Sequence, residues 1–188
     1  MKRILLFSFV VVGFLLAGCT DNSSVLQPPN SDLNKKAVQD KPATLIKLPF
    51  STLNKHKTVT TKIYGNAGGT VEIEGKINKD VEYHGKLEIP AGAFSGKMMF
   101  RIQLDQKYAG FDFGPDGAIF NLPVLFTGDI EGLDLSGVDP NNIKFGFVDD
   151  NEKFVPIAYE KVEVNIKEGI LKVTKAQCMH FSRYNWAK

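Results

Sequence analysis

Hydrophobic and polar residues alternate in short runs from about residue 43 to the end of the chain, and glycine or proline separates most of these runs. In the clearest run, residues 70–77, Val71 and Ile73 alternate with Glu72 and Glu74. A period of two is typical of a β-strand with one face in solvent. Similar patterns predict further strands at residues 57–64, 81–89, 98–104, 119–126, 143–148, 154–159, 162–167, 170–175 and 178–186.

These patterns predict an all-β fold over residues 43–188. No stretch of twelve residues there carries the 3.6-residue repeat of apolar positions that marks an amphipathic helix. Glu168 and Gly169 separate two strand patterns and favour a hairpin, since glycine tolerates the positive φ of a tight turn. Many short strands, frequent turns and no helix indicate a single antiparallel β-sandwich of about ten strands.

The first 18 residues have a different pattern, typical of an export signal. Lys2 and Arg3 precede an apolar stretch at residues 4–16, which is too short for a membrane span. The stretch ends in Leu16-Ala17-Gly18-Cys19, which resembles the lipobox of bacterial lipoproteins. The resemblance implies cleavage before Cys19 and a diacylglyceryl group on its thiol. Acyl chains such as palmitate would then hold the protein on a membrane. The alternative is an ordinary signal peptide with a chance cysteine.

Residues 19–42 follow the signal and predict a flexible, disordered tether. They are rich in polar residues, and their few apolar residues show no periodicity. We therefore expect a signal peptide at 1–18, a lipid-anchored tether at 19–42 and the β-sandwich at 43–188. The protein would be exported and anchored to the cell membrane or the outer membrane. Thr20 stands where some bacteria use Asp for inner-membrane retention, which favours the outer membrane in a cell with two membranes.

Charge and cysteine content narrow the function classes. The chain has a formal net charge of +2, and loss of Lys2 and Arg3 with the signal brings it to zero. A neutral chain without a basic arm has no field that attracts nucleic acid, so we expect no nucleic-acid partner. With Cys19 acylated, Cys178 is the one remaining cysteine, and no intramolecular disulfide can form. Cys178 lies in an apolar stretch, which favours a small buried hydrophobe over a reactive thiol.

Five short motifs point to a family. They occur in the order Gly68-Gly69-Thr70, Ile89-Pro90-Ala91-Gly92-Ala93-Phe94, Pro115-x-Gly117-x-x-Phe120-x-x-Pro123-Val124, Asp149-Asp150 with Phe154-Val155-Pro156, and His180-Phe181-Ser182-x-Tyr184. Together they resemble the ZU-five domain of zonula-occludens proteins, netrin receptors and ankyrins. One departure is Phe154, where family members often carry Trp. The resemblance implies an antiparallel β-sandwich and a bias toward protein interaction, but the partners of those scaffolds do not carry over.

Residues for catalysis or metal binding are few. The three histidines have no metal-ligand spacing, and the chain lacks CxxC, HExxH and GxSxG motifs. We therefore expect neither a conventional enzyme nor a cofactor. A weak alternative is a calcium site from Asp129, Glu131, Asp134 and Asp139, whose oxygen ligands crowd one glycine-rich loop. A solvated loop in which these side chains stabilise turns is the favoured interpretation.

Two further groups of residues leave alternatives open. Tyr108, Phe111 and Phe113 are either an exposed aromatic platform or core residues, and we favour the core. In some members of the ZU-five family, the tripeptide His-Phe-Ser is cut between Phe and Ser. The resemblance therefore implies an alternative function, self-processing between Phe181 and Ser182 with His180 as base. The favoured interpretation is that Phe181 fills the core of a final strand.

The favoured function is that of a non-enzymatic binding or structural module at the cell envelope. Its partners would be the membrane, through the lipid on Cys19, and another envelope protein or a glycan. Self-processing is the competing hypothesis, and the residues around His180 distinguish the two.

Overall fold

The computed structural model describes residues 43–49, 57–149 and 151–188. These residues form eleven β-strands and one 3-10 turn, and no α-helix occurs among them. The strands are β1 (Thr58–Tyr64), β2 (Gly69–Lys76), β3 (Glu82–Ile89), β4 (Lys97–Leu104), β5 (Gly110–Gly114), β6 (Ile119–Glu131), β7 (Lys144–Val148), β8 (Phe154–Pro156), β9 (Lys161–Asn165), β10 (Ile170–His180) and β11 (Arg183–Ala187), and the 3-10 turn η1 (Pro140–Asn142) precedes β7.

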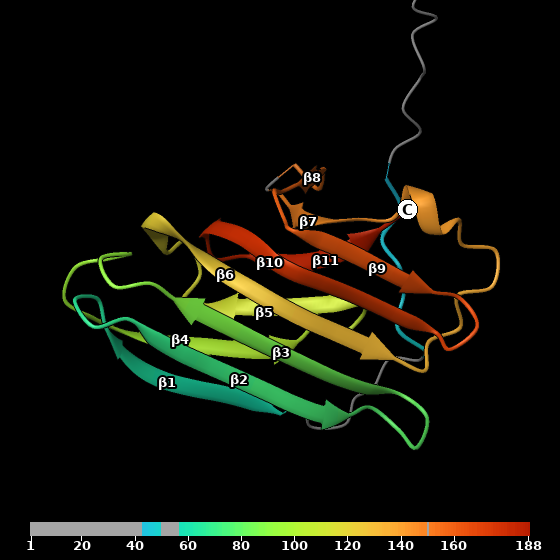
Figure 1. Cartoon of the computed structure of the whole chain (residues 1–188), viewed down its shortest axis with the longest axis horizontal. Helices are drawn as coiled ribbons and strands as arrows, with labels where there is room; N and C mark the ends of the chain where they lie inside the picture. The colour runs from blue at the N-terminus through green and yellow to red at the C-terminus, as the bar shows by residue number, and fades with distance from the viewer. Residues whose placement is uncertain (1–42, 50–56, 150) are drawn as a thin grey trace, which may run out of the picture. The chain divides into compact units, whose positions relative to one another are not determined.

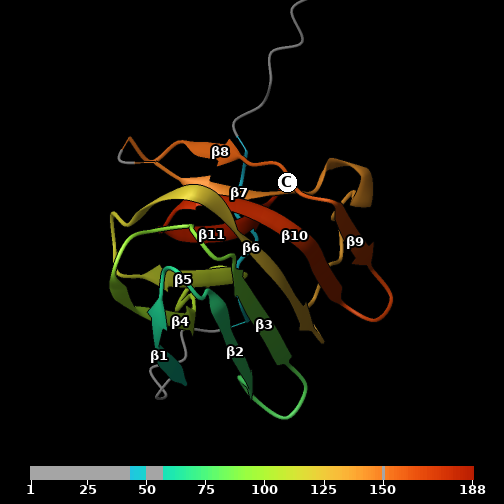
Figure 2. The ribbon, with the colours of Figure 1, turned by 60° about the vertical axis from the view of Figure 1, so that its left-hand side comes forward.

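The strands build two sheets that face each other (Figure 1). One sheet has six strands in the order β1-β4-β5-β11-β7-β8, and the other has five in the order β2-β3-β6-β10-β9. Every neighbouring pair is antiparallel. Figure 2 shows the two layers from a second direction. The predicted all-β fold, an antiparallel sandwich of about ten strands, is confirmed.

Several details of the strand prediction are wrong. The predicted strand 178–186 is split, because β10 ends at His180 in the five-stranded sheet and β11 begins at Arg183 in the six-stranded sheet. Residues 181–182 are thus a corner at which the chain crosses from one sheet to the other. The predicted strand 170–175 is only the first half of β10. This strand passes through a bulge at Lys175, whose φ is 49°, and continues to His180. No sequence pattern predicted strand β5.

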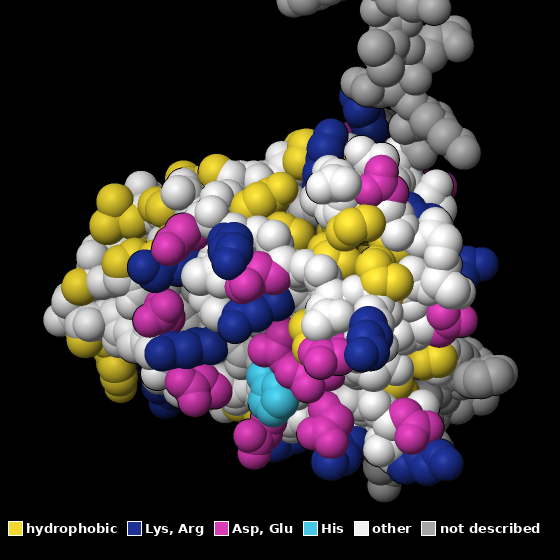
Figure 3. All heavy atoms as spheres, turned by 45° about the vertical axis from the view of Figure 1, so that its right-hand side comes forward, with side chains coloured by type: hydrophobic (Ala, Val, Ile, Leu, Met, Phe, Trp, Pro, Cys, Tyr) yellow, Lys and Arg dark blue, Asp and Glu magenta, His cyan; other side chains and the backbone are white. Residues whose placement is uncertain are grey.

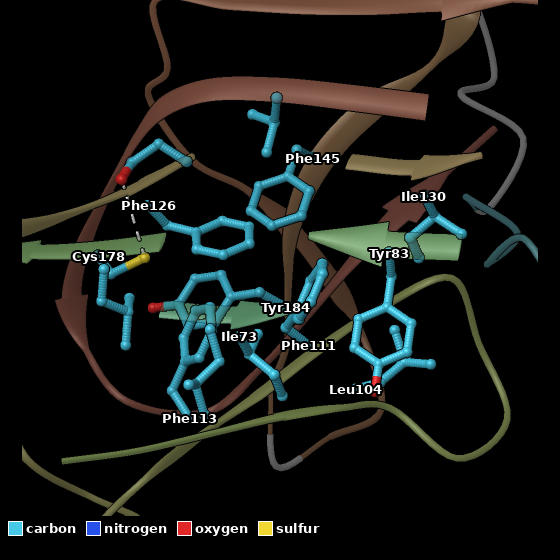
Figure 4. Packing of buried hydrophobic residues seen from close by; sticks show 14 of the residues in the cluster. Ile73, Tyr83, Leu104, Phe111, Phe113, Phe126, Ile130, Phe145, Cys178 and Tyr184 are labelled. Carbon is cyan, nitrogen blue, oxygen red and sulfur yellow. Dashed lines mark hydrogen bonds between the residues drawn. The ribbon is translucent and has the colours of Figure 1, made fainter. Parts of the chain in front are cut away.

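Aromatic rings dominate the core between the sheets. The largest fully buried side chains are Trp186, Tyr184, Phe100, Phe111, Phe113, Phe126, Phe145 and Phe181. Most of their ring pairs are edge-on or tilted, for example Phe113 and Phe126 with centroids 4.9 Å apart (Figure 4), whereas Phe145 stacks on Phe126 and Tyr184. The core interpretation of Phe111 and Phe113 is therefore confirmed, and neither contributes to an exposed platform. Tyr108, the third residue of that group, is half-buried.

Two glycines leave room for these rings. Gly85 of β3 and Gly128 of β6 are partners in the sheet register. A Cβ on Gly85 would lie 3.0 Å from Cε1 of Phe111, and one on Gly128 would overlap the ring of Phe126. A side chain at either position would therefore displace an aromatic ring from the core.

Residues 44–48 pack against the sandwich between the end of β11 and the loop before β5. Thr44 N–H donates to the carbonyl of Lys188 (2.8 Å) and Ile46 N–H to that of Trp186 (3.0 Å). On the other side, Ala109 N–H donates to the carbonyl of Ile46 (2.7 Å). Ile46 and Leu48 are both buried. This short segment therefore closes the core where β5 and β11 diverge.

The predictions for the N-terminal part concern residues that the structure does not describe. The signal peptide at 1–18, Cys19 and the tether at 19–42 all lie outside the described ranges. Within those ranges, no helix reaches the length and hydrophobicity that a membrane span requires.

Candidate functional site

The tripeptide His180-Phe181-Ser182 forms the corner between β10 and β11. Phe181 is buried, and its ring lies 4.8 Å from that of Phe120 and 5.2 Å from that of Phe100. Its N–H donates to the carbonyl of Ala118 at 2.9 Å. The carbonyl of the next residue, Ser182, accepts from the N–H of Phe113 at 3.2 Å. The corner is thus held by backbone hydrogen bonds on both sides and by an aromatic ring in the core.

The His180 imidazole packs against aromatic rings and not against the nucleophile that self-processing would use. It lies edge-on to Phe147, with ring centroids 4.4 Å apart and an interplanar angle of 89°. The Tyr184 hydroxyl donates to the His180 carbonyl at 2.6 Å. Among the described residues, no hydrogen bond joins the His180 imidazole to the Ser182 hydroxyl, and neither residue has a positive φ. A base and nucleophile in contact is the arrangement that activates a serine.

We expect the chain to keep its full length despite this tripeptide. The packing of Phe181 and His180 leaves the serine without a base in contact and the backbone without positive-φ strain. Mass spectrometry of the denatured protein measures this directly. A species that lacks the seven residues from Ser182 onward, present in the wild type and absent in Ser182→Ala, would contradict the expectation and support the self-processing hypothesis.

Cys178 has the environment of a core residue. Its side chain is fully buried, and its thiol lies 3.9 Å from the carbonyl of Ala176 (Figure 4). Burial raises the pKa of the Cys178 thiol far above its usual range, and burial likewise raises the pKa of the neighbouring Tyr184 hydroxyl. Both groups are therefore neutral at physiological pH. The prediction of a small buried hydrophobe at Cys178 is confirmed.

The four acidic residues of the calcium alternative are not assembled into a site. In the described part of the chain, no three His, Cys, Asp or Glu side chains come close enough to hold a metal ion. Two of the four stabilise turns: Asp134 accepts from Ser136 N–H (3.0 Å), and Asp139 accepts from Asn141 N–H (3.0 Å) at the start of η1. This is the turn-stabilising role that the sequence favoured.

Asp129 has a different partner, which the sequence analysis missed. It pairs with His84 across β6 and β3, with Nδ1 of His84 3.0 Å from the carboxylate. The hydrogen bond to Asp129 raises the pKa of the His84 imidazole, and the carboxylates of Glu131 and Glu74 act in the same direction. The two residues are 45 positions apart in sequence, and only the register of the sheet brings them together.

The pair belongs to a charged face on the outside of the five-stranded sheet. Acidic and basic side chains are interspersed over the middle of this face (Figure 3). Lys86, for example, lies 3.7 Å from Glu72 and 3.5 Å from Glu88. A shallow hollow of about 520 Å³ crosses β2, β3 and β6 there. Because charges of both signs neutralise one another across the face, it presents no field of one sign to a charged ligand.

A second surface lies at the end of the sandwich where β6 begins. Ile119, Leu122 and Met179 are exposed there by 78%, 44% and 45%. Ile119 stands opposite His180 in the register, and β6 bulges between this pair and the next, Val124 with Cys178. We call these three residues the apolar end. Hydrophobic side chains gather toward one end of the molecule in Figure 3. Exposed aliphatic side chains in a group are typical of an interaction surface.

Comparisons with known proteins identify no relative of this chain. Neither the family models, nor the curated proteins, nor the solved structures give a match to this chain.

Proposed function

We propose that this chain is a lipid-anchored protein of the bacterial cell envelope, and that its β-sandwich acts as a binding or structural module without catalysing a reaction. The observation that carries the proposal is the lipobox-like Leu16-Ala17-Gly18-Cys19 directly after an apolar stretch. It supports export, removal of residues 1–18 and acylation of Cys19. The polar residues 19–42 then serve as a tether for the sandwich.

The family part of the proposal depends on motif order and fold class. Five ZU-five-like motifs follow one another in the order of that family, and the chain folds as an antiparallel β-sandwich, as that domain does. Since no family model matches the chain, the proposal goes no further than a ZU-five-like module. A bias toward protein partners follows from it.

The apolar end supports a protein as the partner. Its three exposed residues, Ile119, Leu122 and Met179, are aliphatic. Sugar rings are bound by exposed aromatic rings, and the apolar end has none: Phe111 and Phe113 lie in the core, and the exposed Tyr64 belongs to β1. Aliphatic side chains that leave water on contact with another protein contribute roughly 25 cal/mol per Å² of buried area. We therefore propose that the apolar end contacts another envelope protein.

Membrane fractionation tests the anchor. Wild-type protein should partition into detergent with the membranes, whereas Cys19→Ala should remain unprocessed or appear in the soluble fraction, because two or three acyl chains are lost. Thr20→Ala, which keeps the acceptor cysteine, is the control and should behave as wild type. Equal partitioning of wild type and Cys19→Ala would refute the anchor.

The same membranes test the binding surface by chemical cross-linking and mass spectrometry. The double variant Ile119→Asp and Leu122→Asp should lose the cross-linked partner of the wild type, because it places charges on the apolar end. A matched variant on the charged face, Glu88→Lys, should retain it. If both variants keep the partner, the apolar end is not the binding surface, whatever the result for the anchor.

A further inference from the structure

The strands of the two sheets differ in the sign of the charge that they carry. In the six-stranded sheet, the strands hold five cations and one carboxylate, Asp112. In the five-stranded sheet, the strands hold seven carboxylates and five lysines. A chain whose formal charge is zero without Lys2 and Arg3 is therefore polarised between its two sheets. An anionic surface attracts the six-stranded one.

The cations of the two sheets also differ in their partners. In the five-stranded sheet, every lysine except Lys172 forms an ion pair, and the paired ones are Lys76, Lys86, Lys161 and Lys175. In the six-stranded sheet, Arg101 lies 3.6 Å from Asp112 and 3.8 Å from Asp116 of the next loop. No carboxylate of the described residues forms an ion pair with the other cations of this sheet, Lys62, Lys97, Lys144 and Arg183. These four cations are available to an anion from outside.

Two of the four lie in a compact block with two exposed hydrophobic side chains. In the register of β1 and β4, Lys62 stands opposite Met99, and Tyr64 stands opposite Lys97. Both lysines are exposed, Tyr64 is 54% exposed and Met99 is 50% exposed. The four residues share the outer face of the sheet, because the residues that alternate with them turn inward. We call them the lysine block. Figure 1 shows β1 and β4 along one margin of the sandwich.

The composition of the lysine block is suited to the interface of a membrane. Tyrosine is enriched there, since its ring enters the headgroup region while its hydroxyl stays in water. The aliphatic stems of Lys62 and Lys97 can lie along the same apolar layer with their ammonium groups at the phosphates. A soluble anion would neutralise the lysines but leave Met99 in water, whereas a membrane takes up both kinds of side chain.

We propose that the six-stranded sheet lies with its outer face against an anionic membrane, and that the lysine block contacts the phospholipid headgroups. The inference rests on the proposed lipid anchor, which keeps the sandwich near the membrane. The described chain begins beside β11 of the same sheet, where Thr44 N–H donates to the carbonyl of Lys188 at 2.8 Å. Between Cys19 and this point, residues 19–42 reach at most about 80 Å when extended. The anchor therefore leaves the sheet free to lie on the membrane.

Fluorescence quenching tests which face lies on the membrane. In the full chain, Thr60→Cys introduces a thiol on the outer face of β1, next to the lysine block, and Cys178 is buried and does not compete for the label. The labelled protein is reconstituted into vesicles of equal parts phosphatidylcholine and phosphatidylglycerol, with a nitroxide quencher on the headgroups. We expect the label at residue 60 to lose most of its fluorescence at low salt and to regain it at high salt.

Thr70→Cys is the matched control for this experiment. It places the same label at an exposed position on the outer face of β2, in the opposite sheet, and should keep its fluorescence. Equal quenching of the two labels overturns the proposal. So does equal quenching at residue 60 in vesicles of phosphatidylcholine alone, because the contact would then not depend on anionic lipid.

Charge reversal measures the contribution of the two lysines. Each lysine near an anionic leaflet strengthens association roughly fivefold, so Lys62→Glu with Lys97→Glu should lower the docking equilibrium at least about 25-fold and abolish quenching at residue 60. Lys79→Glu with Lys167→Glu makes the same change in net charge at exposed positions in turns of the five-stranded sheet, and should retain it. If both double variants retain the quenching, or both lose it, the lysine block is not the contact.

Flotation separates this proposal from the anchor. Wild type that does not float with phosphatidylcholine vesicles refutes the anchor, whatever the lysine block does. The block alone should then still carry the protein upward with the anionic vesicles at low salt and release it at high salt. Wild type that floats with both kinds of vesicle but shows no quenching at residue 60 leaves the anchor intact and overturns the inference.

Discussion

A chain that ends at Phe181 is expected not to fold, although it loses only seven residues. Those residues contain β11, which lies between β5 and β7 in the six-stranded sheet. Its removal would separate that sheet into two pieces and leave the backbone of both neighbours without ladder partners. It would also remove Tyr184 and Trp186, which are among the largest fully buried side chains of the core.

The magnitude follows from the core residues alone. Truncation of one buried Phe or Trp to Ala costs about 3–5 kcal/mol. Loss of Tyr184 and Trp186 together therefore approaches the ~5–15 kcal/mol by which a domain of this kind is stable. The lost hydrogen bonds of β11 to β5 and β7 add to this. The shortened chain should give a circular dichroism spectrum of a disordered protein and no cooperative thermal transition.

Deletion of Lys188 alone is the matched control. This residue is exposed and loses only its backbone pairing with Thr44, so the chain should remain folded. Cooperative unfolding of a chain that ends at Phe181 would show that β11 is dispensable.

The second large effect is expected for Phe181→Ala, which should lower the free energy of unfolding by about 3–5 kcal/mol. The Phe181 ring contacts rings from both sheets, including Phe100 of β4, Phe113 of β5 and Phe120 of β6. Its removal leaves a cavity at the corner where the chain changes sheets, and the surrounding rings can fill it only in part. Urea denaturation of wild type and variant measures the difference.

Met179→Ala is the control two residues earlier in the chain. Because Met179 is exposed, its truncation should change the free energy of unfolding by no more than about 0.5 kcal/mol. A similar small change for Phe181→Ala would contradict the assignment of this ring to the core. The tripeptide would then need a role other than packing.

Much of the fold could be predicted because its signals are local. Alternation of apolar and polar residues indicates which strands have one face in solvent. For the strand at residues 70–77 and for most others, the predicted ends lie within three residues of the observed ends. Asp134 and Asp139 were expected to stabilise turns, and they do so through hydrogen bonds to residues two positions away. Such contacts depend only on the neighbouring sequence.

Strand β5 was missed for a physical reason. Its residues Gly110, Phe111, Phe113 and Gly114 are buried, so Phe111 and Phe113 suggest a strand face, but the flanking glycines interrupt the alternation. Glycine is depleted in strands, so a run of five residues with a glycine at each end does not stand out as a strand pattern. In the folded chain, a Cβ on Gly110 would collide with the backbone of β11 at Tyr184, so the small residue serves the close approach of two strands.

The sequence by itself therefore determined the fold class, the turn chemistry and the burial of residues such as Cys178, because each follows from a local pattern. Only the tertiary structure decided the order of strands in each sheet. That order makes His180-Phe181-Ser182 a corner, pairs His84 with Asp129 and leaves β1 at an edge. Strand pairing joins residues far apart in the chain, and the pattern within one strand is the same whichever neighbour it has.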